Sequence, residues 1–330
     1  MEKFKWGIIG PGTIAHAFAD DLPRAHSATH VAHAILAKDE SDAIEYSKEF
    51  NIPLHFTRLE EFINNSGVDA VYIATPHVFH YEEAAFCLQN RIPVLCEKPI
   101  TINSKQLAHL IQLSKENNTF LLEGMWIRFL PSINKVLSLY AKGDIGNIIS
   151  IKADMSYKAH YDPHSRYFNP ELGGGSLLDL GIYPVFLSTL LFGKPQEIKA
   201  GGIVTDSRVD GNCTALLSYK SGQTASIECS FITKTEGIAT IYGDKGLIRI
   251  RNPWYEKPEG IDVELYEGTK VFHKCEWEGK GLYFEVDEVY NCISNGFCES
   301  GNYCHHFSLD VMQTLDELRK QLNVVYPAYE

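Results

Sequence analysis

A glycine turn that directly follows a short apolar strand constrains this fold more than any other feature. Residues 5–10 read Lys-Trp-Gly-Ile-Ile-Gly, and the chain continues as Gly-Pro-Gly-Thr-Ile-Ala over residues 10–15 into a helical pattern. This order of strand, turn and helix is typical of a dinucleotide-binding βαβ unit, with Ala15 in place of the third glycine. The helix's free N–H groups would face the pyrophosphate. We therefore expect a dinucleotide site, rather than a plain structural turn, formed by Gly10, Gly12, Thr13 and Ile14.

The end of the second predicted strand bears on the choice of dinucleotide. The strand over residues 30–37 ends in Lys38, followed by Asp39 and Glu40, with Asp42 close behind. An acidic side chain at this point accepts a hydrogen bond from the ribose of NAD, whereas a basic one favours the 2′-phosphate of NADP. Because Lys38 comes first, we expect NADP, with NAD as the alternative. Lys38 could also be an ordinary solvated lysine.

Two later strands of the first half end in polar turns. Residues 68–74 lead into Thr75-Pro76-His77 and on to His80, and residues 94–96 lead into Glu97-Lys98-Pro99. The β-α-β-α alternation predicts a parallel, doubly wound sheet with these turns on the same edge as the glycine turn. We expect contacts with the cofactor there, although either histidine could instead cap the following helix. The expected contacts are Thr75, Pro76, His77, His80, Glu97 and Lys98.

Lys98 is the candidate for acid–base chemistry in this half. It follows a buried strand, and Pro99 restricts it to extended conformations. A lysine held partly out of water can act as an acid or base near neutral pH. The alternative is a surface lysine at an ordinary strand end.

The second half of the chain has a different pattern. Strands are expected from residue 148 on, with a hairpin turn at residues 243–246 and helices near residues 283–295 and 308–322. Strands joined by turns indicate a large, mostly antiparallel sheet in an α+β domain. We therefore expect domains at residues 1–125 and 126–330, with the last helix able to pack back on the first. A sheet with one open face predicts at least a homodimer.

A glycine-rich segment lies between the first two strands of this half. Residues 173–183 read Gly-Gly-Gly-Ser-Leu-Leu-Asp-Leu-Gly-Ile-Tyr, and Asp179 and Tyr183 share one face if the helix is continuous. Gly181 and Pro184 make a kink or a late start possible. Two polar side chains on an apolar helix indicate a functional site, or a buried tyrosine hydroxyl satisfied by Asp179.

Composition narrows the classes of partner. The formal net charge of −12 disfavours nucleic acid and anionic membranes, and no uninterrupted apolar run reaches the length of a membrane span. The eight cysteines include no Cys-x-x-Cys pair, which indicates reduced thiols and a cytoplasmic protein. Cys298, Cys304, His305 and His306 could hold zinc, but their spacing does not match usual ligand sets, so we expect no metal.

With these residues in hand, the chain resembles the Gfo/Idh/MocA (glucose-fructose oxidoreductase / inositol dehydrogenase) family over nearly its full length. The resemblance is carried by the glycine turn, Thr75-Pro76-His77, Glu97-Lys98-Pro99 and the segment 173–183. Residues 123–131, Glu-Gly-Met-Trp-Ile-Arg-Phe-Leu-Pro, look most like the branch of dimeric dihydrodiol dehydrogenase and NADP-dependent D-xylose dehydrogenase. The resemblance implies a Rossmann domain followed by an open-faced sheet domain that dimerises. Relatives that use NADP often have a second basic residue where this chain has Asp42.

The resemblance also implies roles for individual residues. It implies hydride transfer between a nicotinamide and a carbinol carbon of a sugar or cyclic diol, with Lys98 contacting the reacting hydroxyl and Tyr183 as proton acid or base. Asp179 would hold that partner or bind substrate, and Trp126 would wall the pocket, which we expect to include Arg128 and Tyr161. Tyr161, His164 and Arg166 could read substrate hydroxyls or merely coat the surface. The competing hypothesis is a non-catalytic NAD(P)-binding sensor.

Overall fold

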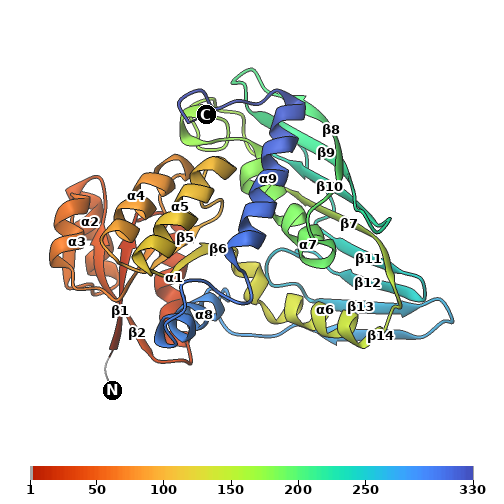
Figure 1. The fold of residues 1–330 in the computed structure, drawn as a ribbon, viewed down its shortest axis with the longest axis horizontal. Coiled ribbons are helices and arrows are strands. Elements are labelled where there is room, and N and C mark those ends of the chain that lie inside the picture. The colour runs from red at the N-terminus through yellow and green to blue at the C-terminus, as the bar shows by residue number, and fades with distance from the viewer. Residues whose placement is uncertain (1–2, 330) are drawn as a thin grey trace. The chain divides into compact units, whose positions relative to one another are not determined.

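The structure is a computed structural model that describes residues 3–329. The chain forms two compact units (Figure 1). Unit 1 comprises the described residues up to Phe129 together with Glu278–His305, and unit 2 comprises Leu130–Trp277 and the described residues from His306 onward. The sequence-based division at residues 125/126 assigned the segment 278–305 to the second domain, whereas the structure assigns it to unit 1. The last helix belongs almost entirely to unit 2.

Unit 1 is built on a six-stranded parallel sheet with strand order β3-β2-β1-β4-β5-β6. The direction of winding reverses between β1 and β4, which is where open sheets of this kind bind ligands. Strands β4, β5 and β6 are buried along their whole length, and Ile8, Tyr72 and Leu95 have no exposed surface. Burial of each such side chain contributes about 1.5–3 kcal/mol. The strands are β1 Lys3–Ile9, β2 Thr29–Leu36, β3 Leu54–Phe56, β4 Ala70–Ile73, β5 Val94–Glu97 and β6 Leu121–Gly124.

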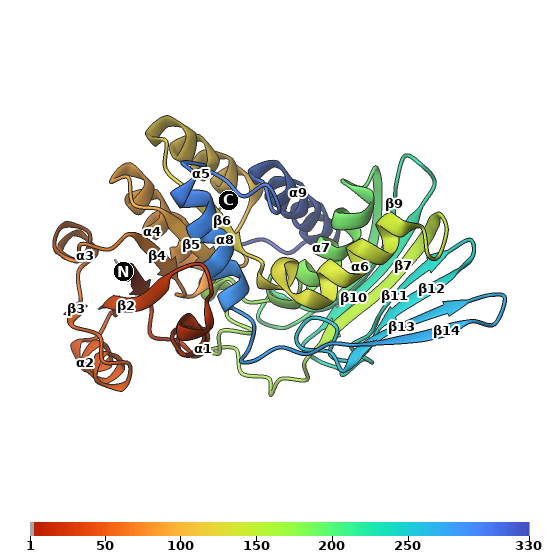
Figure 2. The ribbon, with the colours of Figure 1, turned by 90° about the horizontal axis from the view of Figure 1, so that it is seen from below.

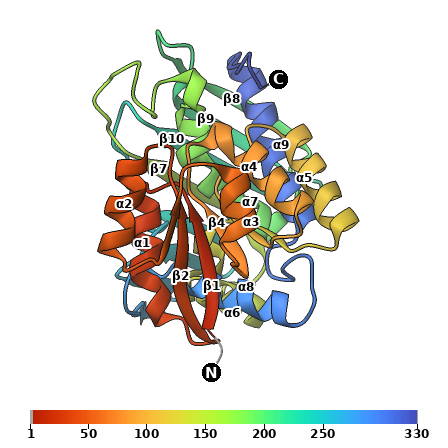
Figure 3. The same ribbon diagram turned by 90° about the vertical axis from the view of Figure 1, so that its left-hand side faces the viewer.

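Helices cover both faces of this sheet, as a doubly wound fold requires. Helices α1 and α2 lie on one side of β1 and β2, and α4 and α5 lie on the other (Figure 3). The ring of Phe18 in α1 stacks on Tyr72 of β4 with centroids 3.8 Å apart. The helices are α1 Thr13–Asp21, η1 Leu22–Arg24, α2 Glu40–Glu49, α3 Leu59–Asn65, α4 His77–Gln89, α5 Ser104–Asn117, η2 Trp126–Phe129 and α8 Tyr283–Ser294.

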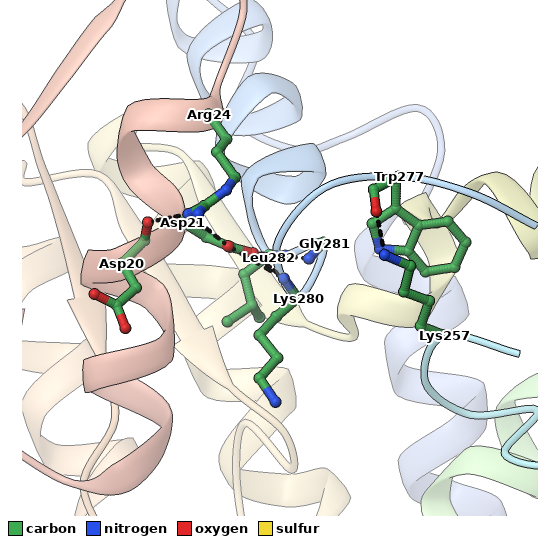
Figure 4. A network of polar contacts seen from close by, with 8 residues as sticks. All are labelled: Asp20, Asp21, Arg24, Lys257, Trp277, Lys280, Gly281 and Leu282. Atoms are coloured by element: carbon green, nitrogen blue, oxygen red, sulfur yellow. Dashed lines mark hydrogen bonds and ion pairs between the residues drawn. The ribbon is translucent and has the colours of Figure 1, made fainter.

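A buried aspartate explains why α8 belongs to unit 1. The carboxylate of Asp21, 1% exposed, accepts hydrogen bonds from the backbone N–H groups of Lys280, Gly281 and Leu282 at 2.7–3.2 Å (Figure 4). Arg24 donates to the same carboxylate at 3.3 Å. These three residues immediately precede α8, so Asp21 fixes from a remote segment how the chain enters that helix. Local sequence patterns contain no sign of this contact.

Unit 2 is built on an eight-stranded sheet with strand order β14-β13-β12-β11-β7-β10-β9-β8. Every pair is antiparallel except β7 with β10, so the predicted, mostly antiparallel sheet is confirmed. The predicted hairpin turn at 243–246 joins β11 to β12. The strands are β7 Ile148–Ser156, β8 Glu197–Val204, β9 Asp210–Ser218, β10 Thr224–Ser230, β11 Ala239–Gly243, β12 Gly246–Ile250, β13 Gly260–Leu265 and β14 Lys270–Lys274.

The helices of unit 2 lie on one side of its sheet (Figure 2). They are α6 Pro131–Lys142, η3 Pro170–Leu172, the π-helical turn η4 Leu177–Gly181, α7 Ile182–Phe192 and α9 His305–Leu322. The segment Pro170–Phe192, which comprises η3, η4 and α7, is long and apolar enough by length and composition to cross a membrane, but 83% of its most apolar window is buried in the structure. It therefore contributes to the core of unit 2.

Candidate active site

The glycine turn after β1 fits a dinucleotide. Gly10 has φ +95°, and a Cβ there would lie 2.9 Å from Cγ2 of Thr75 and 3.0 Å from the Ala74 carbonyl, so only glycine suits this position. Gly12 is the N-cap of α1, and no described side chain caps that helix. The first N–H groups of α1 are thus left for an anion. Gly10, Gly12, Thr13 and Ile14 would hold the pyrophosphate of a nicotinamide dinucleotide.

The residues that would read the ribose follow β2. Lys38, Asp39 and Asp42 are all exposed, and Asp39 is the N-cap of α2. Both signs of charge are therefore available after β2, as the sequence indicated. The preference for NADP or NAD depends on whether Lys38 or the aspartates Asp39 and Asp42 dominate the contact with the ribose.

His80 joins the turns that follow β4 and β5. Its ring is fully buried, with Nδ1 2.8 Å from the Pro99 carbonyl and Nε2 2.8 Å from the Thr75 carbonyl. Burial lowers the pKa of this imidazole, and the two carbonyl contacts only partly offset that effect. Both ring nitrogens lie within hydrogen-bond distance of carbonyls of unit 1, so His80 links the two turns, and its contact with a cofactor stays a prediction. His77 begins α4.

Lys98 follows β5 in a strongly supported turn. The Glu97 carboxylate accepts from the hydroxyl of Tyr72 at 2.6 Å and from the backbone N–H of Lys98 at 3.1 Å. Next to it, Glu285 of α8 is fully buried, and burial together with the charge of Glu97 raises the pKa of Glu285 well above its usual value. The Glu97 contacts with Tyr72 and with the Lys98 N–H therefore anchor the backbone that carries Lys98.

The segment after β6 supports the same turn. Glu123 is 3% exposed and accepts from the Ile100 N–H at 3.0 Å and from the Tyr303 hydroxyl at 2.8 Å. Arg128, predicted in the substrate pocket, is 9% exposed and donates to the carbonyl and side-chain oxygens of Asn302 at 2.8 and 3.1 Å. These contacts show a supporting role for Arg128 inside unit 1. Trp126 is half-buried.

In unit 2, a second glycine turn precedes the residues Asp179 and Tyr183. Oδ2 of Asp210, the first residue of β9, accepts from the Ser176 hydroxyl at 2.7 Å and from the Leu177 N–H at 2.6 Å. Gly175 has φ +120°, and a Cβ there would lie 2.5 Å from Oδ1 of Asp210. Asp210 thereby fixes the start of η4. Instead of one continuous α-helix, η4 makes a π-helical turn before α7, a geometry often found at functional sites.

Asp179 and Tyr183 are both buried in unit 2, at 7% and 5% exposure. Nη1 of Arg166 lies 3.4 Å from Oδ2 of Asp179, and its charge also acts on Tyr183. The sequence left open whether Arg166 contacts substrate hydroxyls or only lies on the surface. In the structure it lies next to Asp179. Tyr161 is 42% exposed and packs edge-on against Phe168.

Two other features of the described residues bear on function. Within residues 3–329, no group of three or more His, Cys, Asp or Glu side chains could hold a metal ion. A depression of about 660 Å³ in unit 2 is lined by Lys142, Phe192 and Lys245 among others, and its lining includes no predicted site residue.

A Rossmann unit with a dinucleotide turn, followed by a large open sheet, defines a two-domain nicotinamide-dependent oxidoreductase. Comparisons with known proteins agree. Residues 4–125 match the family described as "Oxidoreductase family, NAD-binding Rossmann fold", and residues 133–249 match the "GFO/IDH/MocA C-terminal domain". The chain is 30% identical over 328 residues, 98% of each chain, to trans-1,2-dihydrobenzene-1,2-diol dehydrogenase of Mus musculus.

Solved structures share the fold. Aldose-aldose oxidoreductase from Caulobacter crescentus, complexed with glycerol, has a TM-score of 0.87 at 21% identity over 98% of each chain. A 3-ketoreductase from Actinomadura kijaniata, in complex with NADP and TDP-benzene, has a TM-score of 0.84 at 22% identity over 97% of this chain and 98% of that one. The protein belongs to the GFO/IDH/MocA family and is an NAD(P)-dependent oxidoreductase. The enzyme hypothesis is thus confirmed over the sensor hypothesis.

Proposed function

We propose that the protein transfers a hydride between NADP and a carbinol carbon of a cyclic diol or a sugar, of the trans-dihydrodiol or aldose type. The full-length similarity to the mouse dihydrodiol dehydrogenase supports the substrate class. A bound nicotinamide would accept the hydride when the carbinol is oxidised to a carbonyl, and the protein must then take the hydroxyl proton.

Lys98 and Tyr183 are the residues we assign to that proton. The carrying observation is the place of Lys98: it follows β5, two strands from the glycine turn at the carboxyl edge of the sheet, on a backbone held by Glu97. Lys98 would contact the reacting hydroxyl, and Tyr183 would exchange the proton. Asp179 would orient Tyr183 or a substrate hydroxyl, and Trp126 would wall the substrate.

The choice of NADP rests on Lys38. It is exposed and directly follows the last residues of β2, where a basic side chain favours the 2′-phosphate. The NADP complex of the 3-ketoreductase from Actinomadura kijaniata supports the same choice. Lys38→Glu should shift the preference toward NAD by roughly ten- to hundredfold in kcat/KM, the effect of one charge-assisted contact. An unchanged ratio of the two cofactors would contradict this role.

Turnover is tested by the absorbance of the reduced nicotinamide, with NADP and NAD offered separately against trans-dihydrodiols, aldoses and inositols. Lys98→Ala should lower kcat by about a hundred- to ten-thousandfold, and Tyr183→Phe should also impair it, while NADPH still binds. Lys105→Ala, an exposed lysine at the start of α5, is the matched control and should behave as the wild type. Near-normal turnover by Lys98→Ala would refute the assignment.

We also infer that the protein forms a homodimer through the face of the unit 2 sheet that no helix of that unit covers. On this face, exposed apolar side chains lie among ion pairs. Leu216 on β9 is 46% exposed, and Phe272 on β14 is 44% exposed and lies beneath the Arg251 guanidinium. Arg251 itself pairs with Asp262 at 2.8 Å. A second copy of the same sheet would cover these side chains.

Light scattering tests the dimer. Leu216→Arg should halve the molar mass in solution, because it places a charge at the centre of an apolar contact. Phe297→Arg, which changes a side chain of unit 1 that is 60% exposed, is the control and should leave the mass unchanged. A monomeric wild type would rule the inference out.

All eight cysteines are free thiols and most are buried, which supports a cytoplasmic location. Cell fractionation tests this location.

A further inference from the structure

Arg166 is the one residue of the loop between β7 and η3 whose charge reaches Asp179 and Tyr183 in the described contacts. The loop is tied to the second glycine turn, because the Tyr167 carbonyl accepts from the Gly175 N–H at 2.9 Å. The guanidinium of Arg166 lies 4.5 Å from the centre of the Tyr167 ring. Nη1 lies 3.4 Å from Oδ2 of Asp179. Arg166 is thus held from two sides, although 54% of its side chain is exposed.

The electrostatic effect of this placement has a definite sign. Burial is the largest single effect and lowers the pKa of the Arg166 guanidinium, but Asp179, Tyr167 and Tyr183 together outweigh it, so the net shift is upward. The interaction is mutual: a cation that is stabilised by an ionised Tyr183 stabilises that ionised form equally. Removal of Arg166 would leave the negative field of Asp179 less compensated at Tyr183, which favours the neutral phenol.

Other groups of unit 2 that face Tyr183 do not replace Arg166. The ring of Tyr255 lies 6.3 Å from that of Tyr183, and burial raises the pKa of the Tyr255 hydroxyl, so Tyr255 is neutral at neutral pH. Tyr167 carries no positive charge. Asp179, on the same helical segment, is the nearby anion. Among these unit 2 neighbours, Arg166 alone is a cation.

We propose that Arg166 is a positioning residue that neutralises Asp179 and sets the proton affinity of the Tyr183 hydroxyl, so that Tyr183 can exchange a proton near neutral pH. This inference rests on the proposed function, in which Tyr183 is the proton acid or base. It gives the Arg166–Asp179 pair a role in pH dependence, beyond holding the loop.

The proposal predicts opposite effects on the two directions of the reaction. Oxidation of a carbinol needs the ionised Tyr183 to take a proton, and reduction of a carbonyl needs the neutral Tyr183 to give one. Arg166→Gln should raise the pH at which Tyr183 ionises by roughly one unit, the order expected for one partly exposed charge. At pH 7.5, oxidation should then slow by about tenfold, while reduction is retained or extended to higher pH.

The experiment compares wild type, Arg166→Gln, Arg166→Lys and Lys158→Gln. Lys158 is an exposed lysine of the same loop, so its variant removes a charge without touching Asp179. The first readout is the ionisation of Tyr183, followed by NMR of ring-labelled tyrosine and assigned with Tyr183→Phe. The second is the pH profile of kcat/KM in both directions, at low and at 1 M salt.

The expected result is an upward shift of the Tyr183 ionisation in Arg166→Gln, recovery in Arg166→Lys and no shift in Lys158→Gln. High salt should shrink the difference, because the Debye length falls to about 3 Å at 1 M. An unshifted ionisation, or equal loss in both directions, would overturn the proposal. Failure of the proposed function is distinguishable, since normal turnover by Tyr183→Phe would remove the role of Tyr183 whatever the NMR shift.

Discussion

Asp21 in unit 1 and Asp210 in unit 2 are both buried aspartates that hold the start of a helix from a distant part of the chain. They differ in how completely they are satisfied. Asp21 accepts three backbone N–H groups and the Arg24 side chain. Asp210 uses Oδ2 for two donors, and its Oδ1 has no hydrogen-bond partner among the described residues.

This difference indicates different tasks. A carboxylate that accepts from several donors holds the backbone at several points, and its removal would leave those donors without an acceptor. A half-satisfied carboxylate is costly to ionise, and burial accordingly raises the pKa of Asp210 to about 6. Asp210 lies at the turn that leads to Asp179 and Tyr183. The carboxylate with the unpaired oxygen is therefore next to the candidate catalytic residues.

The largest effect is expected for Asp21→Ala. The substitution leaves the N–H groups of Lys280, Gly281 and Leu282 without their acceptor. It should lower the free energy of unfolding by about 2–4 kcal/mol. Urea denaturation measures it. Asp20→Ala, the exposed neighbour, is the control and should stay within about 0.5 kcal/mol of the wild type. Similar losses from both variants would contradict the role of Asp21.

A smaller loss of stability but a specific loss of activity is expected for Asp210→Ala. It should cost about 1–3 kcal/mol in unfolding free energy and slow turnover about ten- to hundredfold, because η4 is no longer held in register. NADPH affinity, measured by fluorescence titration, should be retained. Asp206→Ala, in the exposed turn before β9, serves as the control. Weakened NADPH binding in step with kcat would argue against a local effect.

The pH dependence of stability should separate the two aspartates further. The pKa of Asp210 is about 6 in the folded state against 3.8 as its ordinary value, so the folded protein binds more protons in this window. Stability should therefore fall as pH rises from about 4 to 6, by about 1–2 kcal/mol for this group. Asp210→Asn should remove that part of the slope in urea titrations. An identical slope in wild type and variant would show that Asp210 does not titrate there.

The smallest effect concerns a third carboxyl, Glu83 of α4, whose Oε2 accepts from the Thr75 hydroxyl at 2.6 Å. Burial raises the pKa of Glu83 to about 7. Glu83→Gln should therefore stabilise the protein above pH 7, by on the order of 1 kcal/mol or 2–4 °C in Tm, and leave it nearly unchanged below about pH 4.5, the ordinary pKa of the carboxyl. Calorimetry at the two pH values checks it. Equal Tm changes at both would be inconsistent with this ionisation.

The sequence predicted those parts of the fold that depend on local patterns. The predicted helices near residues 283–295 and 308–322 correspond to α8 and α9, and the predicted strand over residues 30–37 corresponds to β2. Helix α6 was not predicted, although Pro131 at its first turn and Gly143 in the left-handed region after its end are recognisable signals. The return of α8 to unit 1 could not be predicted, because it depends on Asp21 contacts across about 260 residues.

The candidate site divides in the same way. Gly10 and Lys98 could be located from the order of strand, turn and helix, because the turn requires a glycine and Lys98 directly follows a buried strand. The positions of His80 and Arg166 could not. Whether a histidine binds a ligand or two carbonyls of its own chain, and whether a loop arginine meets a carboxylate, is decided by contacts between segments far apart in sequence, such as Arg166 with the η4 residue Asp179.

The contacts of Asp21 with the residues that precede α8 have a consequence for biosynthesis. Unit 1 is interrupted by most of unit 2, so the ribosome must add about 260 residues after Asp21 before its partners exist. At typical elongation rates this takes roughly 13–52 s. During that time the nascent Rossmann segment carries a carboxylate without its amide donors and an uncovered surface where α8 will pack. Folding of the first-made unit is therefore completed among the last steps of synthesis.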